Sequence, residues 1–213
     1  EVMLVGNVGS DFDERFRMEM ERYGIKTINT GSEGPTTGFS LIYDERGDRI
    51  LQVISDAGKI PIRTVWPDCR QTRYLLLGPV LYEIDVDTIL DLIGSSLGGV
   101  FLDPQGLLRR LGRDRKVEHF CERETFKRLV GCMDFIKPNE LEAEVITGLR
   151  DHVESAKTLV EWGADIAVVT LGERGSVACD RKGCFSVPAY KTAAVDPTGA
   201  GDVYAGAFLA EYG

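Results

Sequence analysis

The residues from Asp196 to Asp202 carry the strongest chemical signal in this sequence. Gly199, Ala200 and Gly201 let the backbone approach a ligand closely, and the small residues after them predict a helix that begins near Ala200. The first amides of a helix point outward in a partly positive field, so they can bind an anion. Asp202, in the first turn, could accept the proton of an attacking hydroxyl. The plainer alternative is a flexible turn with an acidic helix cap.

Asn139 and Glu142 form a second chemical pair. They follow Pro138, and their spacing is that of a helix cap and its partner three residues later. The same spacing brings an amide and a carboxylate together at the start of a helix, beside the end of a predicted strand at residues 134–137. Such oxygens could hold Mg²⁺ through water, close to nucleotide phosphates. Both interpretations can hold, because a capping residue can also be a ligand.

A third signal follows the predicted strand at residues 166–170. Thr170, Gly172 and Gly175 lie in a glycine-rich turn, and by itself this pattern is typical of an ordinary β-turn.

Apolar strands alternate with amphipathic helices through most of the chain. Strands are expected at residues 2–5, 75–77, 100–102, 134–137 and 166–170, and a hairpin is expected at 177–179 and 185–187. Helices are expected at 11–22, 86–97, 123–130, 140–147, 152–162 and from 200 onward. This alternation predicts an α/β fold, a doubly wound and mostly parallel sheet with helices on both faces. Ligands of such folds bind beyond the carboxyl ends of the strands. Residues 34–56 differ, because two strand-like runs flank a glycine-containing turn and predict a small antiparallel hairpin that stands apart.

Taken together, the motifs resemble those of the ribokinase-like, or phosphofructokinase-B, carbohydrate kinases. Residues 196–202 read Asp-Pro-Thr-Gly-Ala-Gly-Asp, as in the C-terminal signature of that family. The Asn-x-x-Glu and Thr-x-Gly-x-x-Gly stretches precede it in the order found in the family. The resemblance implies transfer of the ATP γ-phosphate to a hydroxyl of a sugar, a polyol such as inositol, or a nucleoside.

The same resemblance implies roles for individual residues. Asp202 would be the general base, and Gly199, Ala200 and Gly201 would form the anion hole. Asn139 and Glu142 would serve Mg²⁺ and phosphate, and Thr170, Gly172 and Gly175 would line the nucleotide site. Asp103 and Gln105 would contact the substrate, although Gln105 replaces the usual asparagine. Asp196 and Thr198 stand where some members bind a monovalent cation such as K⁺.

The resemblance also covers the organisation of the chain. Residues 1–213 would be the central part of one kinase domain, cut short at both ends. The hairpin at residues 34–56 would be its lid and its homodimer contact. Two alternatives from other classes remain: a catalytically silent nucleotide- or sugar-binding protein, and a dinucleotide oxidoreductase, which the absence of a GxGxxG fingerprint disfavours.

Composition limits the partners and the compartment. The net charge is −9, and the densest basic stretch (Arg109, Arg110, Arg113, Arg115 and Lys116) reads as a solvated helix end or loop, so nucleic-acid binding is not expected. No apolar run is long enough to span a membrane. The five cysteines form no CxxC pair and no zinc pattern, so free and mostly buried thiols in a cytoplasmic protein are expected.

Overall fold

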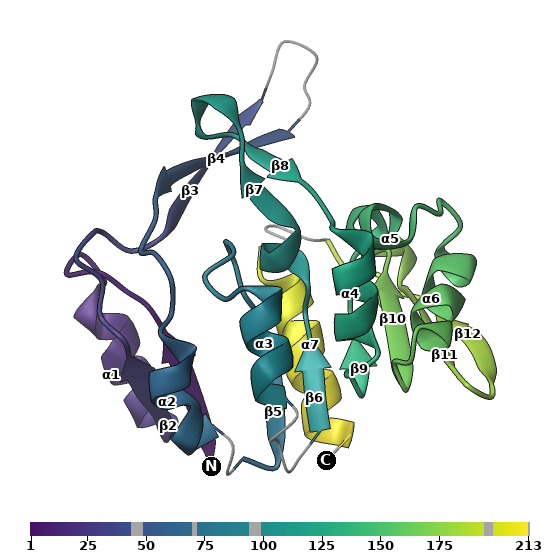
Figure 1. Ribbon diagram of the computed structural model, residues 1–213, viewed down its shortest axis with the longest axis horizontal. Coiled ribbons are helices and arrows are strands. Elements are labelled where there is room, and N and C mark those ends of the chain that lie inside the picture. The colour runs from purple at the N-terminus through teal and green to yellow at the C-terminus, as the bar shows by residue number, and fades with distance from the viewer. Residues whose placement is uncertain (44–48, 70–71, 94–98, 194–197, 213) are drawn as a thin grey trace.

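The computed structural model describes residues 1–43, 49–69, 72–93, 99–193 and 198–212, and its centre is a six-stranded sheet (Figure 1). From edge to edge, the strands are β12 (Gly183–Val187), β11 (Ser176–Asp180), β10 (Ile166–Thr170), β9 (Phe135–Ile136), β6 (Gly99–Leu102) and β5 (Tyr74–Leu77). The strands from β5 to β10 pair in parallel, whereas β11 and β12 run antiparallel. The predicted α/β architecture is confirmed, with a mixed sheet whose inner strands are parallel.

Helices cover both faces of this sheet, as predicted. One face carries α3 (Val86–Ile93), α4 (Arg123–Val130), α5 (Glu140–Thr147) and α6 (His152–Glu161), while α7 (Ala200–Tyr212) lies on the other (Figure 1). The helix α7 is fixed by aromatic packing, because the ring of Phe208 stacks on Phe135 of β9 with centroids 4.2 Å apart. Among the residues that the structure describes, no helix is long and apolar enough to cross a membrane.

A smaller parallel pair lies beside the main sheet. It consists of β1 (Val2–Gly6) and β2 (Ile25–Asn29), with α1 (Glu14–Arg22) between them in the chain and α2 (Ile62–Cys69) nearby (Figure 1). Asp13 caps α1, because its side chain accepts a hydrogen bond from the Arg15 amide. The strand β2 and the helix α2 were not expected from the sequence.

The hairpin within residues 34–56 consists of β3 (Gly38–Tyr43) and β4 (Arg49–Ser55), which pair antiparallel and project away from the main sheet (Figure 1). The turn between them lies outside the described residues. A second hairpin packs against β4: β7 (Arg109–Leu111) and β8 (Val117–His119). The contacts include a hydrogen bond of 2.7 Å from Gln52 Nε2 to the Asp114 carbonyl and one of 2.8 Å from Arg115 Nε to the Val53 carbonyl.

The second hairpin corrects the interpretation of the basic stretch as a solvated helix end or loop. Its residues lie in β7, in the short helical turn η2 (Arg113–Arg115) and at Lys116, directly before β8. The prediction failed because the mostly charged residues of this two-stranded ribbon carry no apolar period that would identify a strand. The basic residues therefore belong to the projecting lobe and help to attach β4 to the rest of the protein.

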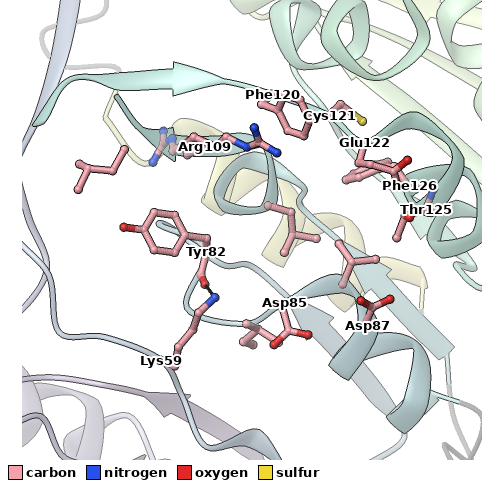
Figure 2. Close-up of a pocket in the computed structure, with 15 residues that line it drawn as sticks. Lys59, Tyr82, Asp85, Asp87, Arg109, Phe120, Cys121, Glu122, Thr125 and Phe126 are labelled. Atoms are coloured by element: carbon pink, nitrogen blue, oxygen red, sulfur yellow. Dashed lines mark hydrogen bonds between the residues drawn. The ribbon is translucent and has the colours of Figure 1, made fainter. Parts of the chain in front are cut away.

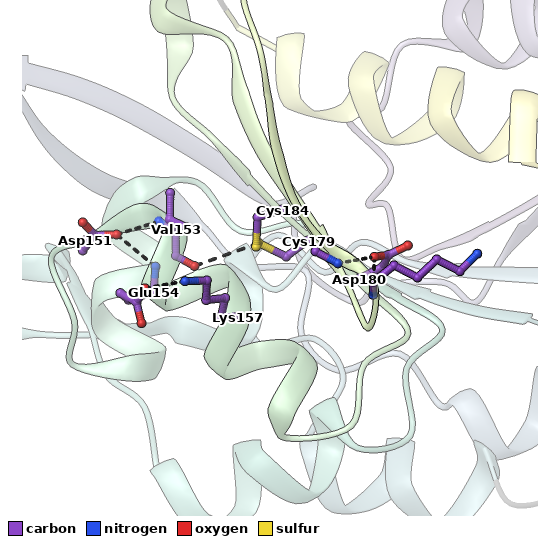
Figure 3. The surroundings of a disulfide bond; sticks show 9 residues. Asp151, Val153, Glu154, Lys157, Cys179, Asp180 and Cys184 are labelled. Atoms are coloured by element: carbon purple, nitrogen blue, oxygen red, sulfur yellow. Dashed lines mark hydrogen bonds and ion pairs between the residues drawn. A yellow bond between two sulfur atoms is a disulfide. The ribbon is translucent and has the colours of Figure 1, made fainter.

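The expectation of five free thiols is also wrong, because Cys179 and Cys184 form a disulfide (Figure 3). They face each other across β11 and β12, with Cα atoms 4.1 Å apart. A separation of five residues is what a tight hairpin needs to bring the pair into register, so the hairpin predicted at residues 177–179 and 185–187 already implied that the two cysteines lie opposite each other. Of the others, Cys69 is buried, Cys121 is half-buried and Cys132 is exposed. The expectation that the thiols are mostly buried therefore fails as well.

Candidate functional site

The carboxyl ends of β6 and β9 bring two charged side chains together. Asp103 follows β6 and Lys137 follows β9, and the Lys137 amide donates a hydrogen bond of 2.9 Å to the Leu102 carbonyl. Lys137 Nζ lies 2.7 Å from Asp103 Oδ2. Only 6% of Asp103 and 3% of Lys137 is exposed, so the pair is an ion pair inside the protein. It lies at the edge of the sheet where ligands of α/β folds bind.

The start of α7 lies directly over this pair. Gly199 has φ 79°, and its carbonyl accepts a hydrogen bond of 2.9 Å from the Val203 amide, which begins the helix. The amides of residues 200–202 therefore precede the first intrahelical donor. A Cβ atom placed on Gly201 would lie only 3.4 Å from Lys137 Nζ, so the ammonium group adjoins the first turn of the helix.

Asp202 occupies the first turn of α7 and is exposed. Its carboxylate bends back toward the helix start, because a Cβ atom on Gly199 would lie 3.9 Å from Asp202 Oδ2. An exposed carboxylate beside open backbone amides and a buried ammonium group is a suitable arrangement for removing a proton near a developing anion.

The start of α5 supplies an amide and a carboxylate. Asn139 caps the helix: its Oδ1 accepts from the Glu142 amide at 2.9 Å, and Glu142 Oε2 accepts from the Asn139 amide at 2.9 Å. Glu142 is only 4% exposed. Burial raises the pKa of its carboxyl group; the Asp103 charge acts in the same direction, whereas the hydrogen bond from the Asn139 amide and the charges of Lys137 and Arg109 oppose it.

The loop after β10 runs beside the start of α5. The Thr170 amide donates a hydrogen bond of 3.0 Å to the Pro138 carbonyl, and Thr170 forms a parallel bridge with Asn139. Gly172 and Gly175 both have positive φ, 58° and 95°. Gly175 is also needed for packing, because a Cβ atom there would lie 2.0 Å from the Val187 carbonyl oxygen. The turn that the sequence predicted is present, and it adjoins the helix start that carries Glu142.

Gln105 connects this edge of the sheet to the projecting hairpins. It begins the short helix η1 (Gln105–Leu108), and its Oε1 accepts a hydrogen bond of 2.9 Å from Arg109 Nη2. The guanidinium group of Arg109 lies 5.4 Å from the centre of the Phe39 ring on β3. Burial lowers the pKa of Arg109, while the charges of Glu142 and Asp103 raise it. Arg109 therefore contacts both Gln105 and β3.

A separate cavity of about 660 Å³ lies beside the site (Figure 2). Its lining comes from the loops before α2 and α3, from β7, and from the segment that leads from β8 into α4. It includes Lys59, Tyr82, Arg109, Phe120 and Glu122. None of the residues that the sequence singled out for phosphate, metal or base chemistry lines it. We therefore locate the candidate site at the strand ends and the start of α7, with Arg109 between that site and the cavity.

The structure thus brings Asp103, Glu142, Gly201 and their neighbours to one edge of the sheet. Asp196 lies outside the described residues, so the cation site predicted for Asp196 and Thr198 stays a prediction. Lys137 is the residue whose position sequence reasoning missed. It directly follows the apolar pair Phe135 and Ile136 of a central strand, and that place in the sequence could have indicated its burial.

For a metal ion, the described residues contain no cluster of three or more His, Cys, Asp or Glu side chains. Asn139 and Glu142 nevertheless fit Mg²⁺ held through water. Glu142 uses one oxygen in the cap, and an ionised carboxylate has about four acceptor positions on two oxygens. A cation beside this buried carboxylate would offset the cost of its charge.

Comparison with known proteins gives consistent results. A family model described as pfkB family carbohydrate kinase matches residues 1–212. The cytidine kinase of Thermococcus kodakarensis is 30% identical over 223 residues, which cover 99% of this chain and 73% of that protein. The deoxyribokinase of Salmonella typhi is 28% identical over 226 residues, covering 99% of this chain and 68% of that protein.

A solved structure supports the same fold. It is that of a pyrophosphate-dependent myo-inositol-1 kinase converted into a myo-inositol-3 kinase; its TM-score is 0.82 at 22% identity, and the match covers 99% of this chain and 70% of that one. At this identity the likeness shows the fold. The chain spans between two thirds and three quarters of the length of these relatives.

Proposed function

Because the chain belongs to the pfkB family of carbohydrate kinases, we propose that it transfers the γ-phosphate of ATP to a hydroxyl group of a small sugar, polyol or nucleoside. One observation carries this proposal: the open helix start at residues 199–202 adjoins the buried ammonium group of Lys137 and the exposed carboxylate of Asp202. Phosphoryl transfer needs a site that binds the phosphoryl group and, next to it, a group that removes the proton of the acceptor hydroxyl.

In this mechanism the acceptor hydroxyl lies against Asp202. The carboxylate takes up the hydroxyl proton as the oxygen attacks the γ-phosphorus in line, and the bond from that phosphorus to the bridging oxygen breaks, which releases ADP. The amides at the start of α7 donate to the oxygens of the transferred group, whose charge they stabilise without rearranging.

Asn139 and Glu142 hold the metal ion through water in this proposal. When bound, Mg²⁺ supplies positive charge that screens the nucleotide phosphates. Thr170, Gly172 and Gly175 lie next to this helix start and line the nucleotide site. The monovalent cation at Asp196 and Thr198 is an optional part of the same proposal.

Gln105 and Asp103 are the proposed acceptor contacts. Gln105 is linked through Arg109 to Phe39 on β3, so an acceptor bound at Gln105 would lie close to the hairpin. A sugar or a polyol such as inositol is the first choice of acceptor, and a nucleoside is the next. The named substrates of the relatives, cytidine and deoxyribose among them, span this range.

The test is an assay of ADP release from MgATP with a panel of sugars, inositols and nucleosides, using a protein that contains this whole chain. Pyrophosphate is offered as a second donor, because one structural neighbour depends on it. Turnover with one acceptor, lost in Asp202→Asn, supports the proposal. Turnover that survives Asp202→Asn contradicts the role of this carboxylate.

A catalytically silent binding protein is the alternative function. The intact Asp202 beside open amides disfavours it, because a protein that only binds has no use for the base. Calorimetry distinguishes the two: tight binding of MgATP and of a panel member, with no ADP formed from the mixture, would favour the silent protein.

The proposal includes a homodimer that forms through the β3–β4 hairpin, and a cytoplasmic location, where ATP is available. Among the hairpin side chains that the structure describes, Leu41 is 45% exposed and Ile54 is 65% exposed. Sedimentation of the wild type and of Ile54→Glu tests the contact. A dimer that the substitution dissociates supports it, and an unchanged dimer places the contact elsewhere.

A further inference from the structure

The buried pair of Lys137 and Asp103 has a chemistry that the family motifs do not account for. Burying an ammonium group in protein is costly unless it is paired, and Asp103 is its one ion-pair partner among the described residues. A lysine ammonium group has three donors, and an ion pair with one carboxylate oxygen does not engage all of them. If the pair served only folding, apolar side chains of similar volume could replace it without loss of stability.

The position of the ammonium group shows where those donors can act. A Cβ atom on Gly201 would lie 3.4 Å from Lys137 Nζ. Because glycine has no side chain, the space next to the ammonium group stays open. Gly201 is in the first turn of α7, whose amides form the proposed anion hole. The proposed anion hole is therefore flanked on one side by Lys137, at the end of β9, and on the other by the first amides of α7.

We propose that Lys137 donates a charge-assisted hydrogen bond to the transferring phosphoryl group, and that Asp103 positions Lys137 for this contact. The proposal rests on the proposed function, and it reassigns Asp103 from the acceptor to Lys137. Lys137 remains protonated throughout: the hydroxyl proton goes to Asp202, and the lysine contributes only positive charge. Its effect is largest when charge grows on the phosphoryl oxygens, so it acts on kcat more than on acceptor KM.

The test compares three variants with the wild type. Lys137→Met is expected to lower kcat about 100- to 1,000-fold with little change in acceptor KM, in the range for loss of one donor to a developing charge. Asp103→Asn keeps a neutral acceptor for Lys137 and is expected to lower kcat less. Lys157→Met is the matched control, because Lys157 also makes a 2.7 Å ion pair, with Glu154, but on the surface.

Folding is separated from chemistry by a double variant. Lys137→Met with Asp103→Leu replaces the buried pair by apolar groups, so it should fold even if the single variant does not. The proposal expects its kcat to stay as low as that of Lys137→Met. Recovery of kcat toward the wild-type value would mean that the pair is structural, and a rise in acceptor KM at unchanged kcat in Asp103→Asn would return Asp103 to the acceptor site.

A binding measurement decides the question even without turnover. If Lys137 contacts the γ-phosphate, the double variant should lose about 10-fold or more in affinity for MgATP but little for MgADP, measured by calorimetry. Equal losses for both nucleotides, or none, would overturn the role of Lys137. A wild-type protein that binds both nucleotides but phosphorylates no acceptor would contradict the proposed function. The change in affinity for MgATP relative to MgADP in the double variant would still test the role of Lys137.

Discussion

The helices α5 and α6 begin with the same chemistry in two different surroundings. At α5, Asn139 caps the helix and Glu142 stands three residues later; at α6, Asp151 caps and Glu154 stands three residues later. The Asp151 side chain accepts from the amides of residues 153 and 154. By sequence spacing alone, either start could be a cap or a ligand site.

Burial separates them. Glu142 is 4% exposed and lies near the charges of Asp103 and Lys137, at the carboxyl edge of the sheet. Glu154 is exposed and pairs with Lys157 on the surface. A capping motif therefore does not identify a site by itself. What marks α5, and equally α7, is that the helix start points to the strand ends, where its polar groups meet other buried charges.

The largest expected effect comes from Asp202 at the start of α7. Asp202→Asn should lower kcat about 100- to 10,000-fold, because a positioned general base contributes about that much. The melting temperature should hardly change, since the carboxylate is exposed. Steady-state kinetics and thermal unfolding measure the two quantities. Asp151→Asn at the start of α6 is the control, and a comparable loss of kcat there would break the distinction between the helix starts.

Filling the space beside Lys137 should have the next largest effect. Gly201→Ala places a methyl group 3.4 Å from Lys137 Nζ and is expected to lower kcat/KM about 10- to 100-fold through misplacement of the phosphoryl group. Gly206→Ala in the same helix meets nothing within 4 Å. It should leave activity unchanged and stabilise the protein by about 0.8–1 kcal/mol, as alanine does in a helix interior. Similar kinetics for the two variants would show that residue 201 adjoins no ligand.

Glu142→Gln tests the start of α5 without removing its cap, because glutamine also serves in a capping box. The concentration of Mg²⁺ needed for half-maximal activity should rise about 10-fold or more, as for other changes near a metal site. Glu154→Gln should leave the Mg²⁺ requirement unchanged. Titration of activity with Mg²⁺ measures the requirement of both variants. An unaltered requirement in Glu142→Gln would mean that Asn139 and Glu142 only cap the helix.

The pH dependence of stability gives a second test of Glu142. Burial raises the pKa of its carboxyl group above the ordinary 4.5, so the folded protein holds this proton more tightly than the unfolded chain. The stability that this provides is complete below pH 4.5 and is lost as the pH rises through the raised pKa. Denaturant unfolding of Glu142→Gln should therefore show a gain over the wild type that grows with pH across that window. A gain that shrinks instead would mean that the pKa is lowered.

The smallest effect is expected at α6. Asp151→Ala removes two hydrogen bonds to helix amides and should cost about 1 kcal/mol of unfolding free energy, with activity unchanged. Asn139→Ala should cost a similar amount and also reduce activity. Chemical denaturation and the kinase assay, run on both variants, complete the comparison.

The sequence predicted the parts of the molecule that are marked by a regular spacing of apolar residues or by glycines at turns and helix starts. The parallel strands, the helices on both faces and the hairpin of β3 and β4 were found in this way, as was the helix that begins at Ala200. It did not reveal the β7–β8 hairpin, where exposed charged residues carry no apolar pattern. The pair of Cys179 and Cys184 was missed because cross-strand register follows from the turn and not from composition.

At the site, the sequence identified the residues that stand next to strand ends but not their mutual contacts. The ion pair of Lys137 and Asp103 joins two positions 34 residues apart, and only the pairing of β6 with β9 brings them together. The same holds for Arg109, whose place between Gln105 and Phe39 depends on how the second hairpin folds.

The most direct test of the account is ³¹P NMR of MgATP incubated with the protein and an acceptor from the panel. If the start of α7 is the phosphoryl-transfer site, the γ-phosphate signal is replaced by that of a phosphate monoester of the acceptor. Asp202→Asn abolishes this change, whereas Asp151→Asn does not. Inorganic phosphate as the sole product, or an ester formed equally by Asp202→Asn, would contradict the claim that the start of α7 is the phosphoryl-transfer site.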